Sequence, residues 1–154
     1  METDLPRKQP ESSGGFTLIE LMIVVAILAI LLAVAIPLLQ NSRLSANEGS
    51  AVASLKSLAS ANQTYKTRFG SYASSLSDLS DSAFIDSVLG SAGAVPGKSG
   101  YIFSYSGLND SWAANADPIS EGATGNRHFY IDTSGVIRFR EGSPSTSADT
   151  PIDS

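Results

Sequence analysis

The stretch Gly15-Phe16-Thr17-Leu18-Ile19-Glu20, followed by the apolar run 21–39, sets the architecture of this chain. The run contains no charged residue and only one helix-breaking residue, Pro37. At about 1.5 Å of rise per residue, a helix over these nineteen residues is about 30 Å long, which matches the hydrocarbon thickness of a bilayer. We therefore expect this segment to span a membrane.

Glu20 is the exception in this apolar setting. It lies four residues after Phe16, inside or at the edge of the apolar segment, where a central charge costs roughly 2.5–3.5 kcal/mol. A cost of this size makes Glu20 a functional candidate. The alternative is a local role, because the dipole and the unpaired amides of a first helical turn also favour a carboxylate.

The heptapeptide that begins at Gly15 resembles the prepilin cleavage and methylation motif of type IV pilins and type II secretion pseudopilins. The match includes the glycine before the cut, the phenylalanine after it, the glutamate at the fifth position of the processed chain, and Pro37 inside the long helix. The resemblance implies that a membrane prepilin peptidase cuts between Gly15 and Phe16 and N-methylates Phe16. It also implies that Pro37 kinks the helix where it loosens during filament assembly.

Residues 1–15 have no apolar periodicity and end in two glycines, so we interpret them as a hydrophilic leader. Arg7 and Lys8 precede the span, and the next basic residue is Arg43. This asymmetry predicts a single-pass inner-membrane protein with a cytoplasmic N-terminus and an external C-terminal part. After assembly, the resemblance implies an extracellular pilus or a periplasmic pseudopilus.

The composition limits what the rest of the chain can be. A length of 154 residues, a formal net charge of −5 and the absence of cysteine indicate one small domain attached to a segment outside its core. The acidic balance gives no support for nucleic-acid binding. Many type IV pilins close a C-terminal loop with a disulfide, which this chain cannot form, so packing and strand pairing must hold its domain together.

Residues 40–70 are predicted to continue the same helix as an amphipathic segment. One face carries an apolar stripe at spacings of four and three, formed by Ala51, Leu55, Leu58, Asn62, Tyr65 and Phe69. The opposite face is polar, with Ser50, Ser54, Lys56, Ser57, Ser60 and Lys66. We expect one helix over residues 17–68 that ends at Gly70, where a left-handed backbone is easiest.

The globular part, residues 71–141, begins with a Ser-, Gly- and Asp-rich connection that contains a short helical turn. Beyond residue 100 the apolar period changes to two, which predicts strands near 101–105, 112–116, 129–131 and 136–139. The last two flank a turn that ends in Gly135 and form a hairpin. We predict an α+β, pilin-like fold: a long helix packed on a three- or four-stranded antiparallel sheet, followed by a disordered tail over 142–154.

Enzymatic chemistry is not visible in the pattern. His128 is the only histidine and has no ligand-spaced partner, so we assign it no catalytic or metal role. Asp78, Asp81 and Asp86 lack the spacing of a calcium loop and are interpreted as a solvated acidic face. We predict no enzymatic activity, no cofactor and no metal. Asn62 and Asn109 match a glycosylation acceptor by pattern alone.

The resemblance implies a structural subunit of a type IV pilus-like filament, polymerised through its N-terminal helix. Its implied partners are further copies of itself, other pilin-like subunits, the prepilin peptidase and the inner-membrane assembly platform. A type II secretion pseudopilin is the close alternative because it shares the motif. An alternative of another class is a secreted binding or enzymatic domain, released by signal-peptide cleavage near Ala35.

Overall fold

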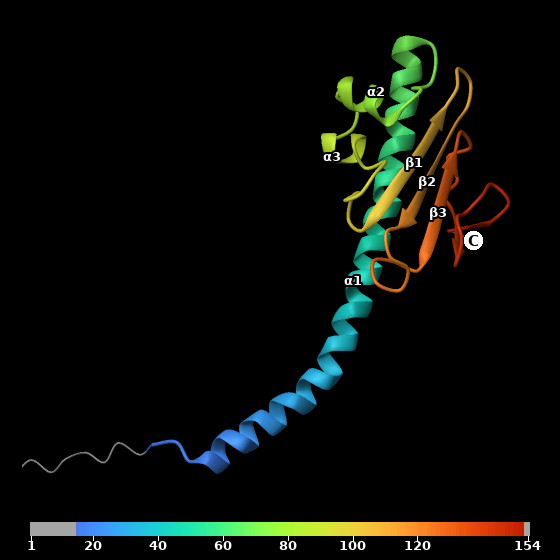
Figure 1. The fold of residues 1–154 in the computed structure, drawn as a ribbon. Coiled ribbons are helices and arrows are strands. Elements are labelled where there is room, and N and C mark those ends of the chain that lie inside the picture. The colour runs from blue at the N-terminus through green and yellow to red at the C-terminus, as the bar shows by residue number, and fades with distance from the viewer. Residues whose placement is uncertain (1–14, 153–154) are drawn as a thin grey trace, which may run out of the picture. The chain divides into compact units, whose positions relative to one another are not determined.

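The structure, a computed structural model, describes residues 15–152. Within this range it consists of a long helix, two short helices and a five-stranded antiparallel sheet, and so confirms the predicted α+β, pilin-like class (Figure 1). The elements in chain order are α1 (Leu18–Phe69), α2 (Leu76–Asp81), α3 (Ser87–Gly90), β1 (Tyr101–Gly107), β2 (Trp112–Pro118), β3 (Arg127–Asp132), β4 (Arg138–Glu141) and β5 (Thr150–Pro151).

Helix α1 extends over the region that the sequence predicts, within one residue at each end. It ends at Gly70, which has a φ of +82° and donates its backbone N–H to Lys66 O at 2.8 Å. The chain divides into two compact units after Pro37, so the second unit, Leu38–Ser154, contains the C-terminal half of α1 and the whole sheet. Each unit is described by itself.

The sheet is a simple meander in the order β1-β2-β3-β4-β5, with every neighbouring pair antiparallel. The predicted hairpin at Gly135 is confirmed as β3–β4, in which Phe129 pairs with Phe139. The prediction of three or four strands was wrong, because the sheet has a fifth strand, β5. Two residues are too few to show the alternating pattern by which a strand is predicted from sequence. The fourth predicted strand, 136–139, lies two residues later in the structure, at Arg138–Glu141.

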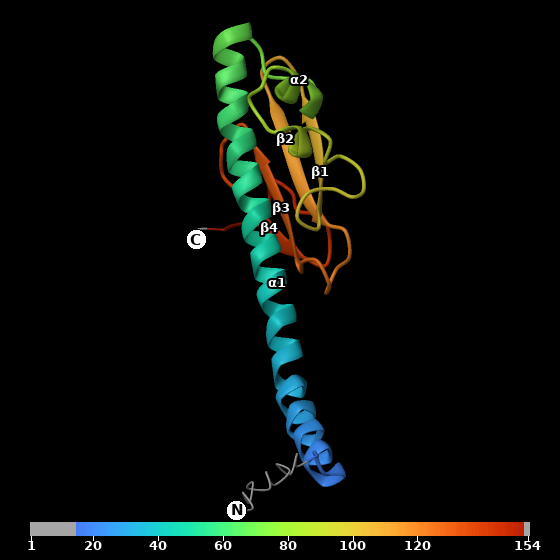
Figure 2. The ribbon, with the colours of Figure 1, turned by 90° about the vertical axis from the view of Figure 1, so that its left-hand side faces the viewer.

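The core of the second unit lies between α1 and one face of the sheet (Figure 2). Four of the six stripe positions on α1 are at most 1% exposed: Ala51, Leu55, Leu58 and Asn62. They meet buried sheet residues that alternate along the strands, namely Tyr101, Phe103, Ala114, Ala116, Phe129 and Ile131. Because buried strand residues recur at every second position, one face of the sheet is apolar and packs on the helix.

Two stripe assignments were wrong. Phe69, at the last position of α1, is 52% exposed because the helix extends beyond the core there. Ser54 was placed on the polar face but is buried, since it adjoins Leu55 and its side chain is small enough to lie at the edge of the interface.

One polar group lies inside this core. Asn62 is fully buried, and its side chain accepts a hydrogen bond from the Tyr105 hydroxyl at 2.7 Å while donating to Leu58 O at 3.1 Å. The hydroxyl also lies 2.9 Å from Ala73 O, so its single proton is shared between these two acceptors. Burial raises the pKa of Tyr105 to about 12, so the phenol stays protonated and joins the helix, the sheet and the connection after α1.

The connection 71–100 contains two short helices where the sequence predicts one helical turn. Asp78 accepts hydrogen bonds from the amides of Ser74 and Ser75 and completes a capping box at the start of α2. Asp86 caps α3 by accepting from Leu89 N at 2.9 Å. Two acidic residues that we had interpreted only as a solvated face therefore shape the backbone here.

The prediction of a disordered tail over 142–154 was wrong for residues 142–152. Asp149 holds this segment in place: its carboxylate accepts from Thr146 N at 2.7 Å and from Arg140 Nε at 2.9 Å. β5 then pairs with β4, and Ile152 N donates to Ile137 O at 2.9 Å. The composition of this segment suggested disorder because it has few apolar residues. The contacts that order it are polar and involve residues near β4, which composition does not reveal.

Candidate processing and assembly site

The predicted cut lies in an open part of the chain. Gly15 is exposed, and nothing lies within 4 Å of the position that a side chain would occupy there. The side chain of Phe16 is 90% exposed. Within residues 15–152, no side chain or backbone atom crowds the position of a Gly15 side chain, so this part of the chain leaves the Gly15–Phe16 peptide bond open. Residues 1–14 of the predicted leader lie outside the described part of the chain.

Glu20 lies in the first turn of α1, where it forms a capping box with Thr17. Its Oε2 atom accepts from Thr17 N at 2.9 Å and from Thr17 Oγ1 at 2.7 Å. In return, Glu20 N donates to Thr17 Oγ1 at 3.3 Å. This reciprocal pattern satisfies two amides that a helix N-terminus leaves free. The local role that the sequence left open for Glu20 is thus present in the structure.

Thr17 is a residue that we did not single out from the sequence. Its signal was available, because Thr17 and Glu20 match the Ser/Thr-x-x-Glu spacing of a capping box directly before an apolar run. The resemblance drew attention to the glutamate and left the threonine unexplained. The structure shows that Thr17 holds the carboxylate beside the peptide that cleavage would turn into a free amine.

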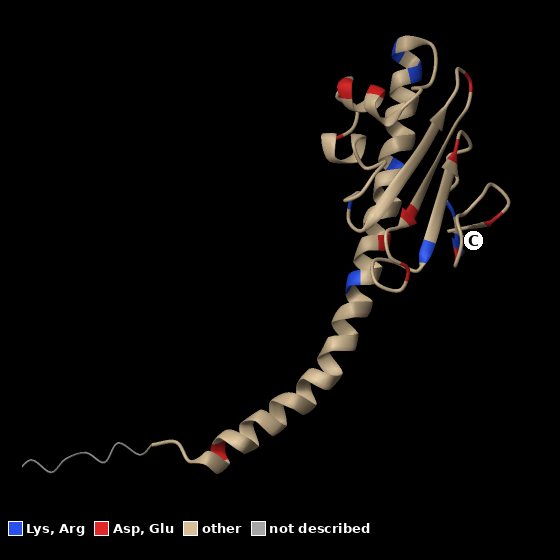
Figure 3. Cartoon of the chain, viewed as in Figure 1, with Lys and Arg blue, Asp and Glu red and all other residues tan. Residues whose placement is uncertain are grey.

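The apolar run that follows is fully exposed. Within α1, a window of eighteen residues near its N-terminus is apolar enough to cross a membrane, and none of that window is buried. Figure 3 shows α1 without charge between Glu20 and Arg43. Such a long exposed apolar surface is unstable in water and needs lipid or a partner helix around it.

Small residues and Pro37 shape this half of α1. Ala26 and Ala29 lie on one side of the helix, in a shallow groove that Leu21, Met22 and Val25 complete. Pro37 lies inside α1, with helix on both sides, and the two compact units divide directly after it. The kink expected at Pro37 stays a prediction, since it concerns how the two units are joined.

The polar candidates of the C-terminal unit have structural partners. His128 lies in β3 and its Nδ1 atom is 2.7 Å from Asp117 Oδ1 on the neighbouring strand, while its buried Nε2 atom contacts no polar partner within residues 15–152. Asp86 forms an ion pair with Lys98 at 2.8 Å, and this bond lowers the pKa of the Asp86 carboxyl. Over residues 15–152 no three His, Asp or Glu side chains gather as metal ligands would.

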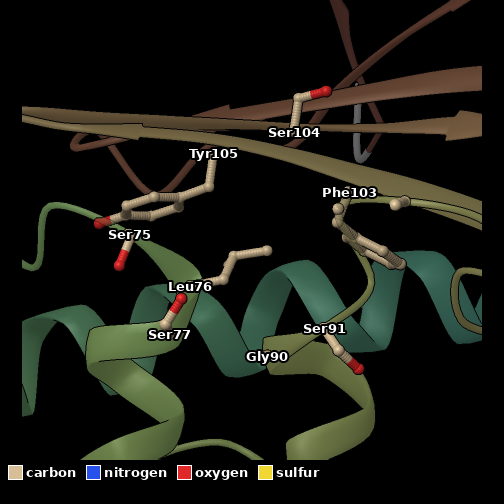
Figure 4. A pocket seen from close by; sticks show the side chains of 10 residues that line it. Ser75, Leu76, Ser77, Gly90, Ser91, Phe103, Ser104 and Tyr105 are labelled. Atoms are coloured by element: carbon tan, nitrogen blue, oxygen red, sulfur yellow. The ribbon is translucent and has the colours of Figure 1, made fainter.

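A pocket of about 450 Å³ lies between β1 and the short helices (Figure 4). Its lining consists mainly of serines and hydrophobic residues, among them Ser75, Ser77, Ser91, Leu76, Phe103 and Tyr105. Ser104 also lines it, but its side chain points to the side of β1 opposite Phe103 and Tyr105. No residue among these is an acid or a base of catalytic strength near neutral pH, because the Tyr105 phenol is held protonated by burial. The pocket offers hydrogen bonds but no acid–base pair.

The two asparagines that match the glycosylation pattern differ in their exposure. Asn62 is fully buried and uses both of its side-chain polar atoms inside the core. Asn109 is exposed in the tight turn between β1 and β2, where Leu108 N donates to Ser111 O at 2.7 Å. Of these two asparagines, only Asn109 is accessible in the folded domain.

Glu48 is a buried carboxylate that sequence reasoning missed. It continues the apolar stripe of α1 by one turn, at three residues before Ala51, and an acid at such a position is ordinarily excluded from a core. Its side chain is 9% exposed and forms an ion pair with Arg127 at 2.8 Å. The helical spacing of the stripe therefore predicts that position 48 is buried, whereas the charge of Glu48 argues against burial.

Comparison with known families decides what the N-terminal features belong to. A family model described as the prokaryotic N-terminal methylation motif matches residues 12–36, which include the open peptide, the capping box and most of the apolar run. The chain carries a prepilin motif. This confirms the resemblance to type IV pilins and pseudopilins that the sequence suggested. Among curated proteins, nothing matches the chain.

Proposed function

We propose that this protein is the structural subunit of a type IV pilus-like filament, made as a prepilin and polymerised through the N-terminal half of α1. The single observation that carries the proposal is the fully exposed apolar half of α1, whose first turn holds one carboxylate within the prepilin motif. A helix of this kind is buried either by lipid or by equivalent helices in a filament core.

Processing precedes assembly in this proposal. A membrane prepilin peptidase cuts the open peptide between Gly15 and Phe16 and N-methylates the new N-terminus. The processed chain stays in the inner membrane as a single-pass protein, with its C-terminal unit on the outer side. The assembly platform then extracts it into a helical filament with other pilin-like subunits, where Glu20 provides the assembly charge. The protein acts by polymerisation and carries out no catalysis.

The motif is common to pilins and pseudopilins, and the exposed helix suits both filaments. An extracellular pilus is our leading proposal and a periplasmic pseudopilus the alternative. The C-terminal unit, without cysteine and without a gathered set of metal ligands over residues 15–152, has neither the disulfide loop of many pilins nor an acidic calcium site. Cell fractionation separates the two, because a pilus is sheared from the cell surface and a pseudopilus is not.

The test is to recover the protein from cells that express the native chain. Intact mass of the recovered protein should equal residues 16–154 with one added methyl group, and electron microscopy of the sheared fraction should show filaments that contain it. A protein that begins near Ile36, or that keeps residues 1–15 and stays monomeric, would contradict the proposal.

A further inference from the structure

In the C-terminal unit, α1 and a loop form a surface directly after the end of the apolar run. The loop between β2 and β3 returns to α1 and contacts it one turn after that run ends. A cavity of about 290 Å³ lies between the two and is lined by Gln40, Arg43, Leu44, Gly122 and Ala123. These five residues, together with the loop 120–126, are called the basal surface below.

Hydrogen bonds to α1 hold the loop rigidly. Asn47 Nδ2 donates to Thr124 O at 2.9 Å. Glu48 Oε1 accepts from Asn126 N at 2.9 Å and from Arg127 N at 3.2 Å, while its Oε2 accepts from Arg127 Nε at 2.8 Å. A buried carboxylate is costly unless it is paired and hydrogen-bonded, and these partners of Glu48 attach the end of the loop to α1.

Arg43 is the basic residue of the basal surface, beside Gly122 and Ala123 of the loop. Its side chain is exposed, and within residues 15–152 it has no ion-pair partner. The two nearby acids do not neutralise it, because Glu48 is paired with Arg127 and the Glu121 carboxylate lies beside Gly142 at the end of β4. The basal surface therefore presents an unpaired guanidinium, with the Gln40 amide as a neighbouring donor.

The position of Arg43 along α1 sets its depth in a membrane. Leu38 and Leu39, the last apolar residues of the run, are 67% and 53% exposed. Arg43 follows Leu39 by four residues, or about 6 Å of helix. The headgroup layer beyond the hydrocarbon core is about 5–8 Å thick on each side. When the run spans the core, Arg43 is close enough to its end along the chain for the guanidinium to reach the lipid phosphates.

We propose that the basal surface binds the phosphate of a phospholipid headgroup through Arg43 and Gln40, and so seats the C-terminal unit on the membrane. Charge complementarity supports this occupant, since a planar guanidinium recognises phosphate with two parallel hydrogen bonds. The loop supports it because Gly122 and Ala123 line the same cavity as Arg43, and Asn47 and Glu48 attach this loop to α1. This binding to lipid requires only the membrane-anchored chain, so the proposal does not depend on whether the protein forms filaments.

The first test measures the contact directly. The full chain with Arg7→Gln, which leaves no arginine before the apolar run, is labelled with ¹³C at the Cζ atoms of arginine and placed in bilayers of phosphatidylcholine and phosphatidylglycerol. Solid-state NMR then records dephasing of the guanidinium signal by lipid ³¹P, and the variants below are made in this background. We expect dephasing in the native chain and in Arg68→Gln, whose arginine lies exposed in the last turn of α1. Arg43→Gln should lose it. Absence of dephasing in the native chain, or equal dephasing in Arg43→Gln, overturns the proposal.

The second test measures the depth of the loop. Because the chain has no cysteine, a spin label can be attached at Ala123→Cys in the basal surface or at Ser134→Cys in the β3–β4 turn. Position 123 precedes β3 and position 134 follows it, and the strand between them is about 20 Å long. A relaxation agent tethered to lipid headgroups should broaden the signal at position 123 and leave that at 134 unchanged. Equal signals at the two positions contradict a seated loop.

Discussion

At the scale of single residues, Glu20 has one role that the structure shows, in capping α1, and a second role that we propose, in filament assembly. Thr17 already supplies two donors to the carboxylate, so the charge is stabilised within its own helix. Cleavage after Gly15 would add a third donor, the α-amino group of Phe16, which is largely cationic near neutral pH and exists only in the processed chain. Inside a filament core an unpaired charge of either sign is costly, so a carboxylate and the amine of a neighbouring subunit favour each other.

The first prediction separates the two roles of Glu20. Glu20→Ala removes both the capping and the intersubunit charge, whereas Thr17→Ala removes only the capping and costs about 1 kcal/mol of helix stability. We expect Glu20→Ala to be inserted and cleaved but to yield few filaments, and Thr17→Ala to assemble nearly as the native chain does. Filament yield by electron microscopy, with intact mass to verify cleavage, measures both.

Co-expression sharpens this comparison. Glu20→Ala mixed with the native chain should reduce filament yield, because a subunit without the charge interrupts the pairing along the filament. Filaments of normal length and yield from a pure Glu20→Ala population would leave Glu20 with its capping role alone. Equal loss in Glu20→Ala and Thr17→Ala would lead to the same conclusion.

The second prediction concerns Gly15, the residue before the cut. The peptidase must approach the backbone closely, and a branched side chain at this position blocks that approach. We expect Gly15→Val to keep the leader, which intact mass detects directly. The structure offers no folding reason for such a loss, since nothing lies within 4 Å of the added side chain. A normal-length processed chain from Gly15→Val would remove Gly15 from the site.

At the scale of elements, the C-terminal segment shows how a short polar stretch becomes ordered. Asp149 receives the Thr146 amide and hydroxyl on one oxygen and the Arg140 guanidinium on the other. The Thr146 amide, and then the Arg140 guanidinium, hold the pKa of the Asp149 carboxyl below its usual value. These bonds bring β5 to the open edge of β4 and cover a strand edge that otherwise invites pairing with another chain.

The third prediction follows from that carboxylate. A lowered pKa in the folded state means that the stabilisation by Asp149 is complete above its unfolded value of about 3.9 and is lost as the pH falls through the lower folded value. We expect Asp149→Asn to exchange the Ile152 amide several-fold faster at neutral pH. In the native chain, acidification below about pH 4 should lower the protection factor of that amide, which is its exchange rate relative to an unfolded peptide at the same pH. Hydrogen exchange read by mass spectrometry on the 142–152 peptide measures this.

Asp110→Asn is the matched control, because Asp110 is 92% exposed and its ion pair with Lys66 is long, at 3.5 Å. It should leave the 142–152 peptide unchanged. If Asp149→Asn also leaves that peptide protected, strand pairing by β5 alone holds the segment and the carboxylate is dispensable.

How much the sequence could predict depends on whether a feature is periodic and local. The stripe from Ala51 to Asn62 repeats at helical spacing, and the strands repeat at two, so the helix, the hairpin at Gly135 and the class of fold follow from the pattern. Asp149 and Glu48 act on partners from other elements, Arg140 and Arg127, and a single sequence does not show such pairs. β5 and the attachment of the β2–β3 loop to Glu48 were therefore missed.

At the scale of the whole molecule, α1 presents two different surfaces along its length. Its N-terminal half is apolar on every side and entirely exposed, whereas its C-terminal half buries one face against the sheet and leaves the other polar. The charged residues follow the same division, since between Glu20 and Arg43 there is none (Figure 3). One continuous helix thus joins a segment that needs lipid or partner helices to a domain that has its own core.

The last prediction tests that division. Residues 41–154 retain every buried residue of the described core, the cap of each short helix and the Glu48–Arg127 pair, and they omit the whole exposed apolar run. The truncation cuts α1 between helical turns that make no contribution to the core, so the remaining helix loses only its natural N-terminus. We therefore expect this fragment to be a soluble, folded monomer, with a fixed near-ultraviolet circular dichroism signal from Trp112. Light scattering after size exclusion measures its mass, and residues 16–154 prepared without detergent should aggregate in the same buffer. An unfolded or aggregated fragment would show that the sheet depends on the apolar half of α1, and the two-unit description would then be wrong.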